Sequence, residues 1–148
     1  MPSTHLSLHY HIVFSTKDRL PVITREWRKD LHSYLGGIIN GLKGVPLATG
    51  GTNDHVHVLF GLRSTHRLDY VMRDLKAGSS LWVHEQVGRK KFDWQPGYFG
   101  VTVSPSQIDR VRKYVLNQEE HHERRSFQEE YLELLKLSRV EYDERYLW

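Results

Sequence analysis

The 148-residue sequence contains no cysteine, which excludes disulfide bonds and thiolate zinc sites. No apolar run is long enough to cross a membrane, and the first residues lack the pattern of a signal peptide. The formal net charge is only +3, so the excess of Lys and Arg permits a nucleic-acid partner without requiring one. These absences fit a cytoplasmic protein with no membrane attachment.

The chain is instead rich in histidine, with ten residues, and 39% of it is hydrophobic. Its length and its 26% charged residues are typical of one globular domain with a real core. The sequence shows no internal repeat, linker or low-complexity segment. We therefore expect a single domain over residues 1–148, with the core sheet within about 1–104 and a helical tail over about 105–148.

The hydrophobic pattern predicts strands where apolar residues alternate and helices where they recur every three or four residues. The expected elements are a strand over 5–15, a helix over 24–43, strands over 45–49 and 56–62, a helix over 68–82 capped by Ser64 or Thr65, and a strand over 98–103. This β-α-β-β-α-β order is that of the ferredoxin-like (RRM-like) α+β fold. In that fold the helices cover one face of the sheet, so we expect the other face to be open.

Two helices are expected after the sheet. The first has Ser106 as its predicted N-cap, with Asp109 three residues later, and a packing stripe at helical spacing. The second begins with a capping box formed by Ser126 and Glu129 and runs to about residue 137. The predicted fold is therefore a ferredoxin-like sheet followed by C-terminal helices.

The segment GGTNDHVHVLFGL places His55 and His57 one residue apart in an apolar strand. Because side chains alternate along a strand, both imidazoles point to the same face. Two neutral imidazoles suit a divalent metal ion but need further ligands. The same pattern also fits an ordinary half-exposed strand. His9 and His11 form a second such pair on the first strand, and we expect them on the same face as plain exposed residues.

Tyr114 and Gln118 lie one helical turn apart after the last strand. The Gln118 amide oxygen suits Mg²⁺ or Mn²⁺, and if it reaches the ion, the Tyr114 hydroxyl is held nearby. A tyrosine beside a metal can attack a phosphodiester and form a phosphotyrosine. The structural alternatives are a helix-flank aromatic for Tyr114 and solvated surface positions for Gln118, His121 and His122.

Together these motifs resemble the single-tyrosine HUH transposases of bacterial insertion sequences, including the branch associated with repetitive palindromes. The matching segments are YHIVFSTKDRLPVI, GGTNDHVHVLFGL, SPSQIDRVRKYVLNQEEHH, and SFQEEY through EYDERYLW. The resemblance covers nearly the whole chain. The paired histidines alone are weakly specific, whereas their combination with Y-x-x-x-Q and the flanking NQEEHH is strong.

The resemblance implies that His55, His57 and Gln118 bind Mg²⁺ or Mn²⁺ and that Tyr114 is the nucleophile. It implies cleavage of single-stranded DNA at hairpin ends through a 5′-phosphotyrosine, in the bacterial cytoplasm. It also implies a homodimer, in which the tyrosine helix of one subunit can complete the site of the other. The pair formed by His9 and His11 has no place in this signature.

Several basic residues are plausible phosphate contacts. They are Arg67, Arg73 and Lys76 on the second helix, and Arg89, Lys90 and Lys91 in the following loop. Two other functions stay open at this point. One is a domesticated hairpin-binding module without catalysis, and the other is a metal-dependent hydrolase that uses water as its nucleophile.

Overall fold

Four antiparallel strands form one sheet in the computed structural model, which describes residues 3–143, 145 and 147. The strands are β1 (His9–Ser15), β2 (Val45–Gly51), β3 (His55–Gly61) and β4 (Phe99–Thr102). Their order across the sheet is β2-β3-β1-β4, so the first and third strands are the central pair. This order confirms the predicted ferredoxin-like α+β fold. Residues 5–8, which were expected to begin the first strand, precede it.

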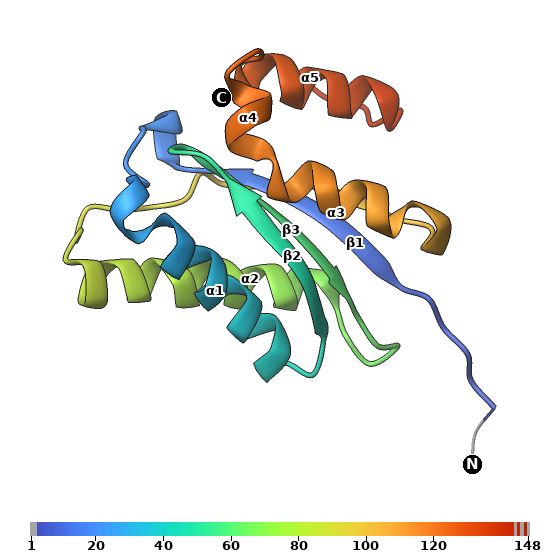
Figure 1. Cartoon of the computed structure of the whole chain (residues 1–148). Helices are drawn as coiled ribbons and strands as arrows, with labels where there is room; N and C mark the ends of the chain where they lie inside the picture. The colour runs from blue at the N-terminus through green and yellow to red at the C-terminus, as the bar shows by residue number, and fades with distance from the viewer. Residues whose placement is uncertain (1–2, 144, 146, 148) are drawn as a thin grey trace.

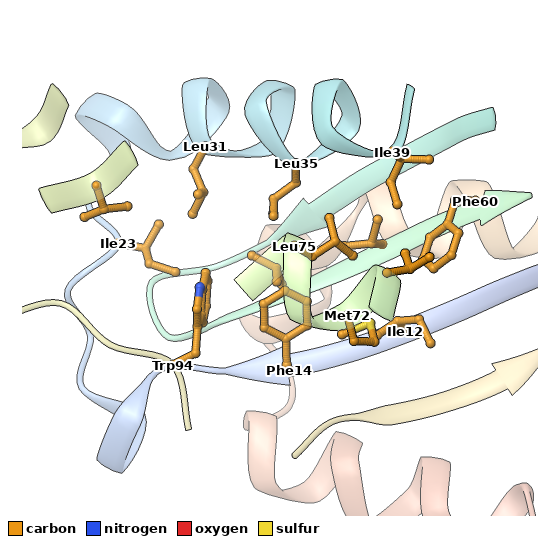
Figure 2. Close-up of a cluster of buried hydrophobic side chains, with 14 of the residues drawn as sticks. Ile12, Phe14, Ile23, Leu31, Leu35, Ile39, Phe60, Met72, Leu75 and Trp94 are labelled. Atoms are coloured by element: carbon orange, nitrogen blue, oxygen red, sulfur yellow. The ribbon is translucent and has the colours of Figure 1, made fainter. Parts of the chain in front are cut away.

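Helices α1 (Arg25–Gly41) and α2 (Leu68–Trp82) pack on one face of the sheet (Figure 1). Their apolar stripes meet the apolar face of the strands, as the alternation predicts (Figure 2). Burying each large side chain here contributes about 1.5–3 kcal/mol, so this layer supplies much of the hydrophobic stabilisation. The core includes Leu31, Leu35 and Ile39 from α1, Met72 and Leu75 from α2, and Ile12, Phe14 and Phe60 from the strands.

The opposite face is not open, and this prediction was wrong. Three C-terminal helices cover it, namely α3 (Ile108–Leu116), α4 (Gln118–His122) and α5 (Phe127–Leu137) (Figure 1). The reason is that Val13 and Leu59 share this face with the histidines and are fully buried. Each of them belongs to an apolar cluster that includes residues of the C-terminal helices. Apolar residues on the histidine face of the sheet therefore require a cover on that face as well.

Helix starts were predicted less well than helix positions. Neither Ser64 nor Thr65 caps α2, because Arg67 occupies the N-cap position. Ser106 lies within a 3₁₀ turn, and α3 begins after Gln107. By contrast, the predicted cap Ser126 is confirmed, since its hydroxyl accepts the backbone N–H of Glu129 at 3.2 Å.

Three short helical turns complete the described chain. They are the 3₁₀ turns Lys17–Arg19 and Pro105–Gln107 and the π-helical turn Val83–Val87. None of the helices in the described residues is both long and apolar enough to span a membrane. The matching segment over 141–148 falls partly outside the description, since residues 144, 146 and 148 are not among the described residues.

The backbone of α3 approaches β2 very closely at Gly50. A Cβ atom added at Gly50 would lie 1.8 Å from the carbonyl oxygen of Val115. Gly50 is paired with His57 across β2 and β3, so it lies on the face that the C-terminal helices cover. The first glycine in GGTNDHVH therefore has a packing role. The second ends β2, because the strand extends through both glycines.

We predict that Gly50→Ala lowers the free energy of unfolding by about 1–3 kcal/mol, because the added methyl group displaces α3 from the sheet. Chemical denaturation followed by circular dichroism measures this change. The control is Gly37→Ala in α1, where a Cβ would meet nothing within 4 Å. That control should stabilise the protein by about 0.5–1 kcal/mol through helix propensity. Equal stability of Gly50→Ala and the wild type would show that α3 does not pack here.

Candidate functional site

Three histidines from the two central strands lie together under the C-terminal helices. His55 and His57 project from β3 to the same face, as the alternation predicts, and both are fully buried. His11 on β1 lies beside them, with its Nε2 atom 2.8 Å from Nδ1 of His57. His11 is 4% exposed, so its predicted position as an exposed strand residue was wrong. His9 lies at the far end of the strand pair, opposite Gly61, and contacts Ser7.

The orientation of the His55 ring is set by Asp54. The Asp54 carboxylate lies 2.8 Å from Nδ1 of His55 and can only accept, so Nδ1 of the neutral ring carries the hydrogen. The Nε2 atom of His55 therefore presents its lone pair to the interior of the site. Burial alone would raise the pKa of Asp54, but its hydrogen bonds with His55 and Thr52 and its electrostatic attraction to the nearby imidazoles together lower this pKa. An acidic partner of this kind is typical of metal-binding histidines.

Gln118, the first residue of α4, faces the same point. Its amide N–H donates to the backbone carbonyl of Tyr114 at 3.2 Å, which turns its Oε1 atom toward the histidines. That oxygen lies 3.1 Å from Nε2 of His55. Two lone pairs therefore face each other, an arrangement that requires a proton or a cation between them. Gln118 is 1% exposed, so the alternative of a solvated surface residue is excluded.

Tyr114 lies at the edge of this cluster, on the α3 helix of the same chain. Its ring is 5.6 Å from the ring of His57 and 6.1 Å from that of His11, edge to face in both cases. Its hydroxyl donates a hydrogen bond to Oε2 of Glu130. Burial, followed by the negative charge of Glu130, raises the pKa of the Tyr114 hydroxyl well above its usual value. The phenol is therefore protonated at neutral pH and is held by a carboxylate.

Two members of the cluster were missed by the sequence reasoning, namely Glu130 on α5 and His122 on α4. Together with His55 they offer ligand atoms that all lie within 4.8 Å of one another. His122 had been assigned to a solvated helix face, yet its side chain is only 11% exposed. One signal was available for Glu130, because it is an acidic residue on the apolar stripe of α5, between Phe127 and Leu134.

The charge on Glu130 is stabilised by its imidazole neighbours. Burial alone would raise its pKa, but hydrogen bonds from His122 and His57 outweigh burial and hold this pKa well below the usual range. In turn, burial alone would lower the pKa of His122, but the hydrogen bond to Glu130, the charge of that carboxylate and the hydrogen bond to the backbone of Arg125 together raise it. His121, with a side chain 29% exposed, also lies 3.3 Å from Glu130. Glu130 is thus an ionised carboxylate at 2% exposure.

An ion pair fastens α4, and with it Gln118, to the rest of the fold. Arg28 on α1 is 7% exposed and donates from Nη2 to the carbonyl oxygen of Ile23 at 2.9 Å. Its Nη1 atom donates to Glu119, the residue after Gln118, at 2.6 Å. Because one partner is buried, this pair constrains α4 more than an exposed pair would.

The predicted phosphate contacts have different surroundings in the fold. Arg67 and Arg73 lie over the ring of Tyr70 on α2, at 4.1 and 4.8 Å from its centre. Lys76 donates to the carbonyl oxygens of Gln95 and Gly97 and so anchors the loop before β4. Burial lowers the pKa of Lys76. The remaining three residues are Arg89, Lys90 and Lys91. They line a pocket of about 520 Å³ together with Lys17.

The chain is similar to several known proteins in sequence and in fold. The profile of the IS200-like transposases matches residues 4–118. The transposases of insertion sequence IS200 from Salmonella typhimurium and Salmonella typhi are each 29% identical over an alignment of 121 residues that covers 78% of this chain and 79% of theirs.

Two solved structures share the fold. A candidate transposase from Deinococcus radiodurans R1 is 25% identical with a TM-score of 0.66, covering 80% of this chain and 95% of that one. A REP-associated tyrosine transposase bound to a REP hairpin has a TM-score of 0.56 at 12% identity, covering 78% of this chain and 68% of that one. At such low identity the second likeness shows the fold alone.

Because of its buried histidines, we predict that the metal-free protein loses stability in mild acid. Burial, followed by the neighbouring His57, lowers the pKa of His11 to about 3, and burial lowers that of His57 to about 4. In the unfolded chain both regain a pKa of about 6.5, so the unfolded state binds more protons below that pH. The free energy of unfolding should therefore fall as the pH decreases from about 6.5 toward about 4.

The variant His11→Gln removes one of these groups and keeps a hydrogen-bonding side chain. Its pH dependence in this window should be shallower by up to about 1.4 kcal/mol per pH unit. Urea denaturation in the presence of a chelator, at several pH values, measures both slopes. An identical slope in the two proteins would mean that His11 is protonated as easily in the folded state as in water.

Proposed function

The chain belongs to the family of IS200-like transposases and is therefore a transposase enzyme, and we propose that it cleaves and rejoins single-stranded DNA through a phosphotyrosine on Tyr114. The observation that carries the proposal is the convergence of four residues within one chain. Under the C-terminal helices the amide oxygen of Gln118 contacts the imidazole of His55, and Glu130 links the imidazole of His57 to the hydroxyl of Tyr114.

The side chains present fit a divalent cation. His55 and Gln118 direct lone pairs at each other, and the ionised Glu130 adds a negative charge to the same place. Imidazole, amide and carboxylate donors of this kind suit Mn²⁺, and the oxygen donors suit Mg²⁺ as well. We propose His55, His57 and Gln118 as ligands of Mg²⁺ or Mn²⁺. When bound, the cation would polarise the scissile phosphate and stabilise the departing 3′ oxygen.

The reaction needs few other groups. The Tyr114 oxygen bonds to phosphorus while the bond from phosphorus to the 3′ oxygen breaks. The proton of the Tyr114 hydroxyl is in net terms transferred to the departing 3′ oxygen, which leaves a 5′-phosphotyrosine and a free 3′ hydroxyl. Because a phosphotyrosine ester retains the bond energy, a new 3′ hydroxyl can attack it and rejoin the strands without ATP. Gln118 aids this chemistry by tying the backbone of Tyr114 to the ligand cluster.

The architecture favours a site completed within one subunit. Tyr114 lies beside His57 of its own chain, and α3 packs on its own β2. We retain the predicted homodimer as a proposal, and exchange of the tyrosine helix between two copies would require α3 to leave Gly50.

We also propose that residues 1–148 act as one domain. Because both imidazoles are fully buried, part of the C-terminal cover has to move when a phosphodiester enters.

We propose DNA with hairpin ends in the bacterial cytoplasm as the partner. A structural relative is bound to a REP hairpin, which supports this choice of substrate. Among the basic residues, the pocket bearing Arg89, Lys90 and Lys91 is the better candidate for phosphate contacts, because Lys76 is engaged by the loop before β4. Arg67 and Arg73 are paired with Asp69 and Asp74 at exposed positions, where such pairs are weak.

We predict that Tyr114→Phe abolishes covalent attachment to DNA and leaves hairpin binding intact, because only the nucleophile is removed. The substrate is a single-stranded oligonucleotide that carries an imperfect hairpin with single-stranded flanks and is labelled at its 3′ end. With Mn²⁺ present, the wild type should retain the label on a denaturing gel. The exposed Tyr142 provides the control Tyr142→Phe, which should behave as the wild type.

The same experiment separates the alternative functions. A hydrolase that uses water would cut the oligonucleotide without any labelled protein, and a binding module without catalysis would shift the hairpin without cutting it. An adduct formed by Tyr114→Phe would rule out Tyr114 as the nucleophile.

The contact between Asp54 and His55 generates a second prediction. The variant Asp54→Asn should weaken Mn²⁺ binding by about ten- to a hundredfold, because the acidic partner that orients the ligand is lost. Titration of Mn²⁺ followed by electron paramagnetic resonance of the free ion measures the dissociation constant. Asp30→Asn on the exposed side of α1 is the control and should bind as the wild type. Unchanged affinity in Asp54→Asn would show that His55 is not held for the metal.

A further inference from the structure

Glu130 places its two carboxylate oxygens in different surroundings. Its Oε1 atom lies 3.0 Å from Nε2 of His57, 3.6 Å from Nε2 of His55 and 3.2 Å from Nε2 of His122. Its Oε2 atom accepts the hydrogen bond of the Tyr114 hydroxyl. The carboxylate therefore spans the space between the imidazoles and the proposed nucleophile.

The distances around Oε1 match the spacing of ligands around a cation. Around an octahedral ion with bonds of about 2.1 Å, neighbouring ligand atoms are about 3.0 Å apart. The three contacts that link His57 to Glu130, His55 to Gln118 and His55 to Glu130 measure 3.0, 3.1 and 3.6 Å. These contacts join the four donor atoms in one continuous series that runs from Gln118 through His55 and Glu130 to His57.

A purely structural role explains this residue less well. A buried carboxylate is costly to desolvate, and an apolar residue of similar size would continue the stripe of α5 without that cost. The orientation of the histidine rings also favours a metal-binding role over a structural one. His122 donates from Nδ1 to the carbonyl oxygen of Arg125 at 2.6 Å, so its Nε2 atom, like that of His55, is directed at the carboxylate and the amide oxygen.

We propose that Glu130 is a further ligand of the cation held by His55, His57 and Gln118, supplied by α5 and lying outside the three-ligand set that the sequence motifs predict. This inference rests on the proposed function for the existence of the cation. Oε1 is the ligand atom, while Oε2 stays with the Tyr114 hydroxyl. Cation binding then joins the sheet, α4 and α5 at one point.

The absence of cysteine makes a direct test available. The variant Glu130→Cys introduces the only thiol of the chain, and a thiolate ligand binds Cd²⁺ strongly. We expect one equivalent of Cd²⁺ to produce the ultraviolet charge-transfer absorption of a thiolate–Cd²⁺ bond. The matched control is Glu129→Cys, one residue earlier on the same helix and exposed, which should show no saturable absorption at one equivalent. Equal behaviour of the two variants overturns the proposal.

The variant Glu130→Gln provides a second measurement that keeps the size of the side chain. Its dissociation constant for Mn²⁺ should rise at least tenfold, whereas Glu129→Gln should bind as the wild type. Circular dichroism and the free energy of unfolding establish that each variant is folded. In addition, Mn²⁺ should slow amide hydrogen exchange over 127–137 in the wild type, and this protection should be lost in Glu130→Gln.

The variant His57→Ala separates failure of this inference from failure of the proposed function. If His57→Ala weakens Mn²⁺ binding and Glu130→Gln does not, the metal site stands and Glu130 is not its ligand. If neither variant affects Mn²⁺ binding, the cation binds elsewhere and the proposed metal site itself is wrong. The formation of the Tyr114 adduct tests the proposed function independently of either result.

Discussion

The close packing of α3 against the sheet is the contact on which the rest of the site depends. At Gly50 the backbone of Val115 comes so near that any side chain would separate the two elements. Because Gly50 pairs with His57, this approach sets the phenol of Tyr114 beside the imidazole. It also removes the histidine face from water, so that every electrostatic contact beneath the helices is stronger than it would be at the surface. The absence of a side chain at Gly50 on β2 therefore determines the surroundings of His57 on β3.

The sequence predicted the parts of the structure that local patterns control. The order of strands and helices followed from hydrophobic spacing, and the cap at Ser126 from its capping box. The pattern also identified His55, His57, Tyr114 and Gln118, which the structure brings together. It placed His11 on the correct face but wrongly as an exposed residue. It missed Glu130, because the contact of Glu130 with His57 joins residues 73 positions apart. No local pattern records that a histidine on one strand and an acidic residue on the last helix meet.

Burying so many polar groups at the centre of the molecule has an energetic cost that the fold offsets elsewhere. Ionised Glu130 and the imidazoles around it replace apolar contacts that would have stabilised this layer. Compensation comes from the purely apolar layer on the other side of the sheet and from fixed anchors such as the pair of Arg28 with Glu119. A cluster of buried polar groups that lowers the stability of the fold, and whose members have hydrogen-bond partners, is typical of a functional site. The energetic balance therefore points to this face independently of the sequence motifs.

The two faces of β3 are coupled by the geometry of the strand itself. Shifting the strand by one residue would turn Val56 and Val58 toward the C-terminal helices and His57 into the apolar core. The core under α1 and α2 therefore holds the register, since burying an imidazole there would leave its polar atoms unpaired. The histidines are positioned by the hydrophobic residues on their far side, before any cation or DNA is bound. Preorganisation of the ligands is thus a consequence of core packing, and residues with no contact to the site, such as Val58, set the precision with which the imidazoles are held.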